Sequence, residues 1–328
     1  MAIWKSLCVS GLLLCAGTAH AAGLKSLEVP ARAAGPAMKV LQWSPCDRPP
    51  GEVKLGPFVL DAVRDCPVAG GKHPLIVLSH GYGGTYLSHR DTAAALADAG
   101  FIVAALNHPD DNALTFDPAR ANSLTSLVDR PEDIRRLIDF MLAEAPDAAM
   151  IDPEEIGFFG FSRGGYTGLV LAGAEPDFKA MRTHCDDPTG ESCALVDPDL
   201  APTGPWVHDG RIKAFVIADP LAGVFPTART LSGISAPVQL WRSQDGGDGV
   251  SPKEVDAIAA NLPAGTEFRV VPGSSHFAFL AVCPEAMRAS LAEICTDPAG
   301  FDRAGFHDRL NLAVSAFFQK HLQRPDAR

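Results

Sequence analysis

A serine between two glycines lies near the middle of the sequence, in the motif GFSRG at 160–164. An apolar segment, Ile156 to Phe159, precedes it, and a segment rich in Gly and Ala, Gly164 to Gly173, follows it. A strand that turns sharply into a helix holds such a serine exposed at the strand end, where its hydroxyl can attack a carbonyl carbon. In a chain with 30 glycines the five letters alone are weak evidence. Their place between a strand and a helix predicts that Ser162 is a nucleophile.

A nucleophilic serine needs a base, and one histidine late in the chain fits that role. His276 ends the segment FRVVPGSSH at 268–276, in which FRVV is interpreted as the last strand. Of the ten histidines, it alone combines a late position with a loop after a strand. His80 is interpreted as a structural hydrogen-bonding group, and His108 as a solvated or pocket-lining side chain. We expect His276 to take the proton from Ser162.

The acid that orients this histidine has three candidates at strand ends. Asp219 follows one apolar segment, and Asp245 and Asp248 both follow the next. A carboxylate at any of these positions can accept a hydrogen bond from His276 and stabilise its protonated form. Asp248 is preferred because DGVSP at 248–252 leads directly into a helix, and Asp245 and Asp219 stay open as alternatives.

Two backbone N–H groups are needed to stabilise the negative charge that develops on the carbonyl oxygen. One is expected from Arg163, the residue after the serine. The other is expected from the loop SHGYGG at 79–84, which continues the apolar segment PLIVLS at 74–79. Glycines let this backbone approach a substrate closely, and we assign the second donor to the N–H of Tyr82.

Short apolar segments alternate with longer amphipathic ones from residue 74 onwards. Strands are predicted at 74–79, 101–106, 156–159, 212–218, 238–242 and 268–271, with two more forming an edge hairpin within 37–63. Helices are predicted at 87–99, 130–145, 164–173, 252–261 and 302–321. Asp129 is the expected N-cap of the second helix, with Pro131 in its first turn. This order indicates an α/β fold with a mainly parallel sheet, helices on both faces, and ligands at the carboxyl ends of the strands.

The chain is expected to hold one domain after a cleaved leader. Residues 1–21 have the features of a signal peptide: Lys5, an apolar run at 7–17 and the small-residue site AHA at 19–21. That run is too short to span a bilayer, so a periplasmic or secreted protein without a stable membrane anchor is predicted. No linker divides residues 22–328. The polar segment 175–210 breaks the alternation and is the candidate for a lid.

The charge and the cysteines limit the possible partners. The net charge is −11, or −12 without Lys5, and no Lys/Arg cluster interrupts the acidity, which argues against nucleic acid as a partner. An even number of cysteines in an exported chain predicts disulfides. Their spacing lacks the pattern of a zinc site, so no metal is expected. The expected local pairs are Cys46 with Cys66, Cys185 with Cys193, and Cys283 with Cys295.

Six motifs resemble the bacterial branch of the dienelactone-hydrolase-like and platelet-activating-factor-acetylhydrolase-like α/β-hydrolases, over most of the mature chain. They are SHGYGG at 79–84, RPEDI at 130–134, IGFFGFSRGGYTGL at 156–169, RIKAFVIADP at 211–220, PVQLWR at 237–242 and SSHFAFL at 274–280. The resemblance implies the α/β-hydrolase fold and a Ser-His-Asp esterase that needs no cofactor. The acetylhydrolases place their acid after the strand that here ends at Asp219, whereas related bacterial hydrolases place it after the next strand, where Asp248 stands.

The residues and the resemblance together predict a serine hydrolase that cleaves carboxylic esters through an acyl-enzyme. Short acyl esters, lipid-like esters and lactones are the implied small-molecule substrates. True dienelactone hydrolases use a cysteine nucleophile, where this chain has Ser162. The competing hypotheses are a binding protein that keeps the fold without turnover, and an exported peptidase. The complete set of nucleophile, base, acid candidates and oxyanion donors favours the esterase.

Overall fold

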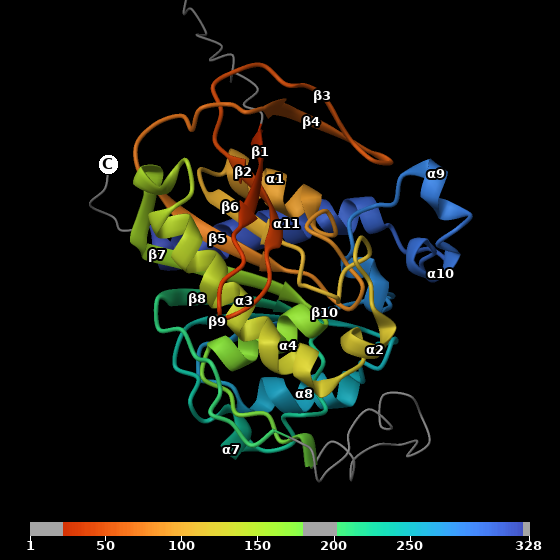
Figure 1. The fold of residues 1–328 in the computed structure, drawn as a ribbon. Coiled ribbons are helices and arrows are strands. Elements are labelled where there is room, and N and C mark those ends of the chain that lie inside the picture. Colours follow the sequence, from red (N-terminus) through yellow and green to blue (C-terminus); the bar gives the residue numbers. More distant parts are fainter. Residues whose placement is uncertain (1–21, 180–201, 324–328) are drawn as a thin grey trace, which may run out of the picture.

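The computed structural model describes residues 22–179 and 202–323, and a single mixed sheet runs through its centre (Figure 1). Ten strands form this sheet in the order β10-β9-β8-β7-β5-β6-β2-β1-β4-β3. The strands are β1 (Ala22–Val29), β2 (Met38–Ser44), β3 (Gly51–Leu55), β4 (Phe58–Arg64), β5 (His73–Ser79), β6 (Ile102–Leu106), β7 (Ile151–Phe161), β8 (Ile212–Ala218), β9 (Val238–Ser243) and β10 (Glu267–Val271).

Strands β5 to β10 run parallel to one another, and this part of the sheet matches the predicted strands closely. Their side chains are almost wholly buried in β5, β6 and β8, because helices cover both faces of a parallel sheet. The carboxyl ends of these strands meet at one edge, where ligands bind in folds of this kind. The predicted α/β architecture is confirmed.

The first four strands complete the sheet beyond β6. The predicted edge hairpin is present as β3 and β4, which pair antiparallel. The remaining part of the predicted region forms β2, which lies inside the sheet between β6 and β1. The prediction missed β1. Partly exposed and exposed side chains lie between the buried side chains of this strand, so its sequence contains no continuous apolar segment that would indicate a strand.

The helices form a layer on each face of the sheet (Figure 1). Helices α3, α4 and α8 contribute Ile134, Leu169 and Ile258 to one apolar cluster, whereas α1 and α11 contribute Leu96 and Val314 to the other. The helices are α1 (Arg90–Asp98), α2 (Pro118–Ala121), α3 (Leu124–Ala143), α4 (Arg163–Leu171), α7 (Ala228–Leu231), α8 (Pro252–Asn261), α9 (Glu285–Arg288), α10 (Ala292–Cys295) and α11 (Arg303–Leu322), with short 3-10 turns η1 (Ala148–Met150) and η2 (His276–Phe279).

Helix α3 begins earlier than predicted. Its N-cap is Ser123, whose side chain accepts from the Ser126 N–H, and the expected cap Asp129 lies inside the helix. Pro131 therefore occupies an interior position, where it cannot donate the usual backbone hydrogen bond. The sequence prediction was wrong here because a proline is typical of a first turn, and it drew the boundary toward Asp129.

Two of the three predicted disulfides lie in the described ranges, and both are formed. Cys46 pairs with Cys66, and Cys283 pairs with Cys295. Cys185 and Cys193, like the predicted signal peptide and most of the predicted lid, lie outside the described residues. Within the described ranges, no helix has the length and apolar character that a bilayer span requires.

Candidate active site

Ser162 occupies the turn between β7 and α4, in a backbone conformation that residues with side chains rarely adopt. Its φ is 56° and its ψ is −119°. The Ser162 N–H donates to the Ala218 carbonyl at 3.0 Å, and its carbonyl accepts from the Leu221 N–H at 3.1 Å. Because its N–H is tied to the last residue of β8 and its carbonyl to the segment that follows β8, the neighbouring chain holds the turn in this strained form.

Two glycines make the turn possible. A Cβ atom at Gly160 would lie 2.2 Å from the Gly164 carbonyl oxygen, and one at Gly164 would lie 2.0 Å from the Ser79 carbonyl oxygen. No side chain fits at either place without movement of the backbone. The predicted strand-turn-helix context of Ser162 is therefore present, and α4 packs directly against the end of β5.

His276 forms a buried pair with Asp219. The Nδ1 atom of His276 lies 2.7 Å from Oδ2 of Asp219, and both side chains are almost completely inaccessible to solvent. Ser243 supplies two more donors to the same carboxylate, its N–H to Oδ1 at 2.9 Å and its hydroxyl to Oδ2 at 2.7 Å. A carboxylate can only accept hydrogen bonds, so the Nδ1 atom of a neutral His276 must carry the proton and donate it to Asp219. The other ring nitrogen, Nε2, is then the basic atom.

The preferred acid Asp248 does not occupy this position, and neither does Asp245. Both carboxylates are exposed in the loop after β9, and Asp219 takes the place beside His276. The loop reaches the histidine through its backbone, since the Gly246 carbonyl accepts from the His276 N–H at 2.8 Å. The expectation of Asp248 is corrected, because this loop folds back on itself at Gly247 and Val250 and leaves both carboxylates exposed, with that of Asp248 acting on the charge of Arg163.

Phe161 connects the serine turn to the histidine. Its ring stacks on the imidazole of His276 with a centroid separation of 4.5 Å. The Nε2 atom of His276 is buried and has no hydrogen-bond partner among the residues that the structure describes. The atom that would accept the serine proton is thus held beside the residue before Ser162.

The loop predicted to carry an oxyanion donor lies against the serine. A Cβ atom at Gly81 would come within 3.0 Å of the Ser162 Cβ. The guanidinium of Arg163 stacks over the ring of Tyr82 at 4.1 Å, so the two predicted donor residues are in contact through their side chains. Arg163 is also the first residue of α4, where N–H groups lack an acceptor within the helix.

Beneath this loop lies a buried cation that sequence reasoning did not assign to the site. Arg130, which is 1% exposed, donates from Nη1 to Asp111 at 2.7 Å and from Nε to Thr167 at 3.2 Å. Its Nη2 donates to the His80 carbonyl and to the Ser79 hydroxyl. Burial lowers the pKa of Arg130 to about 10, while the negative charge of Asp111 opposes this shift. The guanidinium therefore stays charged at neutral pH. The motif RPEDI was the only signal in the sequence.

The two histidines near this cation are neutral. Burial, reinforced by the charge of Arg130, lowers the pKa of His80 to about 3 and holds that of His108 well below its usual value. His80 Nε2 accepts from the His108 N–H at 3.1 Å, which places the His80 proton on Nδ1, where it donates to the Gly81 carbonyl. His108 is buried and bonded to Ser79 and Asp133, which corrects its interpretation as a solvated side chain.

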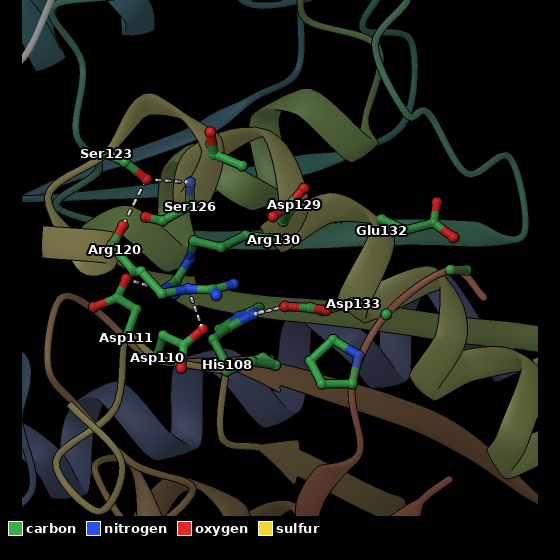
Figure 2. A pocket seen from close by; sticks show the side chains of 15 residues that line it. His108, Asp110, Asp111, Arg120, Ser123, Ser126, Asp129, Arg130, Glu132 and Asp133 are labelled. Atoms are coloured by element: carbon green, nitrogen blue, oxygen red, sulfur yellow. Dashed lines mark hydrogen bonds and ion pairs between the residues drawn. The ribbon is translucent and has the colours of Figure 1, made fainter. Parts of the chain in front are cut away.

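A polar cavity of about 280 Å³ opens beside this network (Figure 2). Figure 2 shows Arg130 directed at Asp111, and His108 directed at Asp133, at the inner wall of the cavity. Neither Ser162 nor His276 lines it. Its walls come from residues 34–36, from the loop after β6 and from the first half of α3.

Comparison with solved structures identifies the fold. A ferulic acid esterase from Streptomyces cinnamoneus matches with a TM-score of 0.63 at 17% identity, with 94% of each chain covered. A dienelactone hydrolase from Anabaena variabilis matches with a TM-score of 0.53 at 15% identity, with 92% of this chain and 99% of that chain covered. The protein has the α/β-hydrolase fold. Residues 52–132 match the family described as platelet-activating factor acetylhydrolase, isoform II, so the predicted resemblance is confirmed. No curated protein gives a significant match.

The protein brings its polar residues together at the carboxyl edge of the sheet. Ser162 follows β7, Asp219 follows β8, and His276 follows β10. The loop after β5 lies against the serine at Gly81. In the described part of the chain, no group of three or more His, Cys, Asp and Glu side chains is arranged to hold a metal ion.

Proposed function

We propose that the protein is a serine esterase in which Ser162, His276 and Asp219 form the catalytic triad. The observation that carries the proposal is the buried pair of His276 and Asp219 beside the strained turn of Ser162. The buried carboxylate orients the imidazole, and Nε2 has no hydrogen-bond partner among the residues that the structure describes. Such an imidazole is suited to take a proton from a serine hydroxyl.

The reaction proceeds in two halves. Ser162 Oγ attacks the ester carbonyl carbon while its proton passes to Nε2 of His276, and Asp219 stabilises the imidazolium. The N–H groups of Tyr82 and Arg163 donate to the oxyanion. The bond to the leaving alcohol breaks as His276 returns the proton to its oxygen. A water molecule then releases the acid from the acyl-enzyme by the same steps.

The proposed substrates are small carboxylic esters, including short acyl esters, lipid-like esters and lactones. The match to the acetylhydrolase family and the structural likeness to a ferulic acid esterase and a dienelactone hydrolase support this class. The two described disulfides support an oxidising compartment, the periplasm or the exterior, as the place of action.

A series of p-nitrophenyl esters of increasing acyl length tests the proposal. We expect the wild type to hydrolyse at least one of them and to react with a fluorophosphonate probe, whereas Ser162→Ala does neither. A wild-type protein that is folded, but inert to every ester and to the probe, would contradict the proposed function.

A further inference from the structure

We propose that Arg130 is a positioning residue that holds both oxyanion donors in place from beneath. The inference rests on the proposed function, because it concerns how Tyr82 and Arg163 present their N–H groups to the ester. Arg130 lies on α3, outside the nucleophile turn and outside the loop that it supports.

One set of contacts fixes the loop on both sides of Tyr82. Before Tyr82, Nη2 of Arg130 donates to the carbonyl of His80. After Tyr82, the N–H of Gly83 donates at 2.9 Å to Oδ1 of Asp111. The other oxygen of that carboxylate, Oδ2, accepts from Nη1 of Arg130 at 2.7 Å. The peptide groups that flank the Tyr82 donor are therefore tied to one guanidinium.

A second set of contacts reaches the other donor. Nε of Arg130 donates to Oγ1 of Thr167 at 3.2 Å, and this hydroxyl donates to the carbonyl of Arg163 at 2.8 Å. The contact fixes the first turn of α4, whose leading N–H belongs to Arg163. Arg163 also keeps its side chain 3.5 Å from Asp111, so both halves of the oxyanion hole share the same buried charges.

The planar guanidinium is what makes this arrangement possible. It offers five N–H donors in fixed directions, and Arg130 directs them at four different acceptors. A lysine at the same place would keep the charge but could not reach all of these acceptors with its single nitrogen. Oxyanion donors stabilise a transition state only when they are held at the position of the developing charge, so a looser loop lowers the rate of the chemical step.

Two variants separate positioning from folding. Arg130→Lys keeps the buried charge beside Asp111 but loses the planar, five-donor guanidinium. Thr167→Val keeps Arg130 and removes the two contacts of the Thr167 hydroxyl, which accepts from Nε of Arg130 and donates to the Arg163 carbonyl. The matched control is Arg303→Lys. Arg303 is also a buried arginine, paired with Asp297 and bonded to the Ile294 carbonyl, at the start of α11.

We expect Arg130→Lys to lower kcat for p-nitrophenyl acetate by about 10- to 100-fold, and Thr167→Val by about 3- to 10-fold, with KM changed less than 3-fold. The Ki of a trifluoromethyl ketone, which forms an oxyanion adduct with a serine, should rise by the same factor as kcat/KM falls. Amide hydrogen exchange in residues 79–84 should become faster in Arg130→Lys. Arg303→Lys should lower thermal stability while kcat per active site remains that of the wild type.

Wild-type kcat in both Arg130→Lys and Thr167→Val would overturn the inference and leave the proposed esterase intact. A fall in kcat that is matched by Arg303→Lys would also overturn it, because a loss of general stability would then account for the effect. Hydrogen exchange reports on the loop without any turnover, so unchanged exchange at residues 79–84 in Arg130→Lys is evidence against positioning even if no ester proves to be a substrate.

Discussion

Asp219 and His276 lie 57 residues apart in the chain, yet Oδ2 of the aspartate is 2.7 Å from Nδ1 of the histidine. Asp219 directly follows β8, and His276 opens the 3-10 turn after β10. Strand β9 lies between them in the sheet, and its last residue, Ser243, donates to the same carboxylate. The pair is thus formed across a strand, and that strand also supplies the support for the acid.

This geometry predicts different effects for the three candidate acids. Asp219→Asn should lower kcat by about 10³- to 10⁴-fold, because the amide cannot hold the imidazole in the required tautomer or stabilise its charge. Asp248→Asn and Asp245→Asn should remain within about 3-fold of the wild type, since both carboxylates are exposed. Steady-state kinetics on one p-nitrophenyl ester measures all three. A large loss in Asp248→Asn, with normal kcat in Asp219→Asn, would reverse the assignment.

The nucleophile turn should tolerate no side chain at Gly164. A Cβ there would lie 2.0 Å from the Ser79 carbonyl oxygen, so Gly164→Ala must push α4 away from β5. We expect a loss of about 2 to 4 kcal/mol in the free energy of unfolding, measured by urea denaturation, together with the loss of ester hydrolysis. Gly71→Ala is the control, because a Cβ at Gly71 meets nothing within 4 Å. Equal stability of the two variants would contradict the close packing.

The stability of the protein should depend on pH through Asp133. Burial raises the pKa of this carboxyl to about 7, although Arg130 and Arg136 oppose the shift. In the unfolded chain the pKa is about 4, so between these values the native state keeps a proton that the unfolded state has released. The resulting contribution to stability is therefore complete below about pH 4 and is lost as the pH rises through about 7.

Asp133→Asn should remove this pH dependence. We expect the free energy of unfolding of the wild type to fall by about 2 to 4 kcal/mol more than that of the variant between pH 4 and pH 8. Urea denaturation at four pH values measures the difference. Asp308→Asn, at an exposed position on α11, should give a curve parallel to that of the wild type. A parallel curve for Asp133→Asn would show that the carboxyl is ionised throughout.

The disulfide of Cys283 with Cys295 should stabilise the segment that follows His276. It closes a loop with a sequence separation of 12, which corresponds to about 2 to 3 kcal/mol of unfolding free energy in the chain-entropy account. The double variant Cys283→Ser/Cys295→Ser should lose that amount under oxidising conditions. Under reducing conditions the bridge of Cys46 with Cys66 is opened in both proteins, and the double variant should then have the same free energy of unfolding as the wild type. Non-reducing peptide mapping would contradict the pairing if it joined Cys283 to any other cysteine.

The sequence alone predicted the parallel part of the sheet with good accuracy. Strand β8 and helix α8 have the predicted boundaries, because a buried parallel strand is a continuous apolar run and an exposed helix start is marked by Ser251 and Pro252. The same local signals placed Ser162 on a turn between a strand and a helix. They were insufficient for β1, in which the buried side chains do not form such a run.

Tertiary structure decided which residues accompany Ser162. Parallel strands end at one edge of the sheet, so Asp219, Asp245 and Asp248 all reach that edge, and spacing along the chain cannot rank them. The strand order and the path of each loop bring the Asp219 carboxylate to His276 and direct the other two into solvent. The sequence thus determines the chemical types that gather at the edge. Contacts between distant segments determine which of them touch, because a hydrogen bond requires a few ångströms of precision that local patterns do not carry.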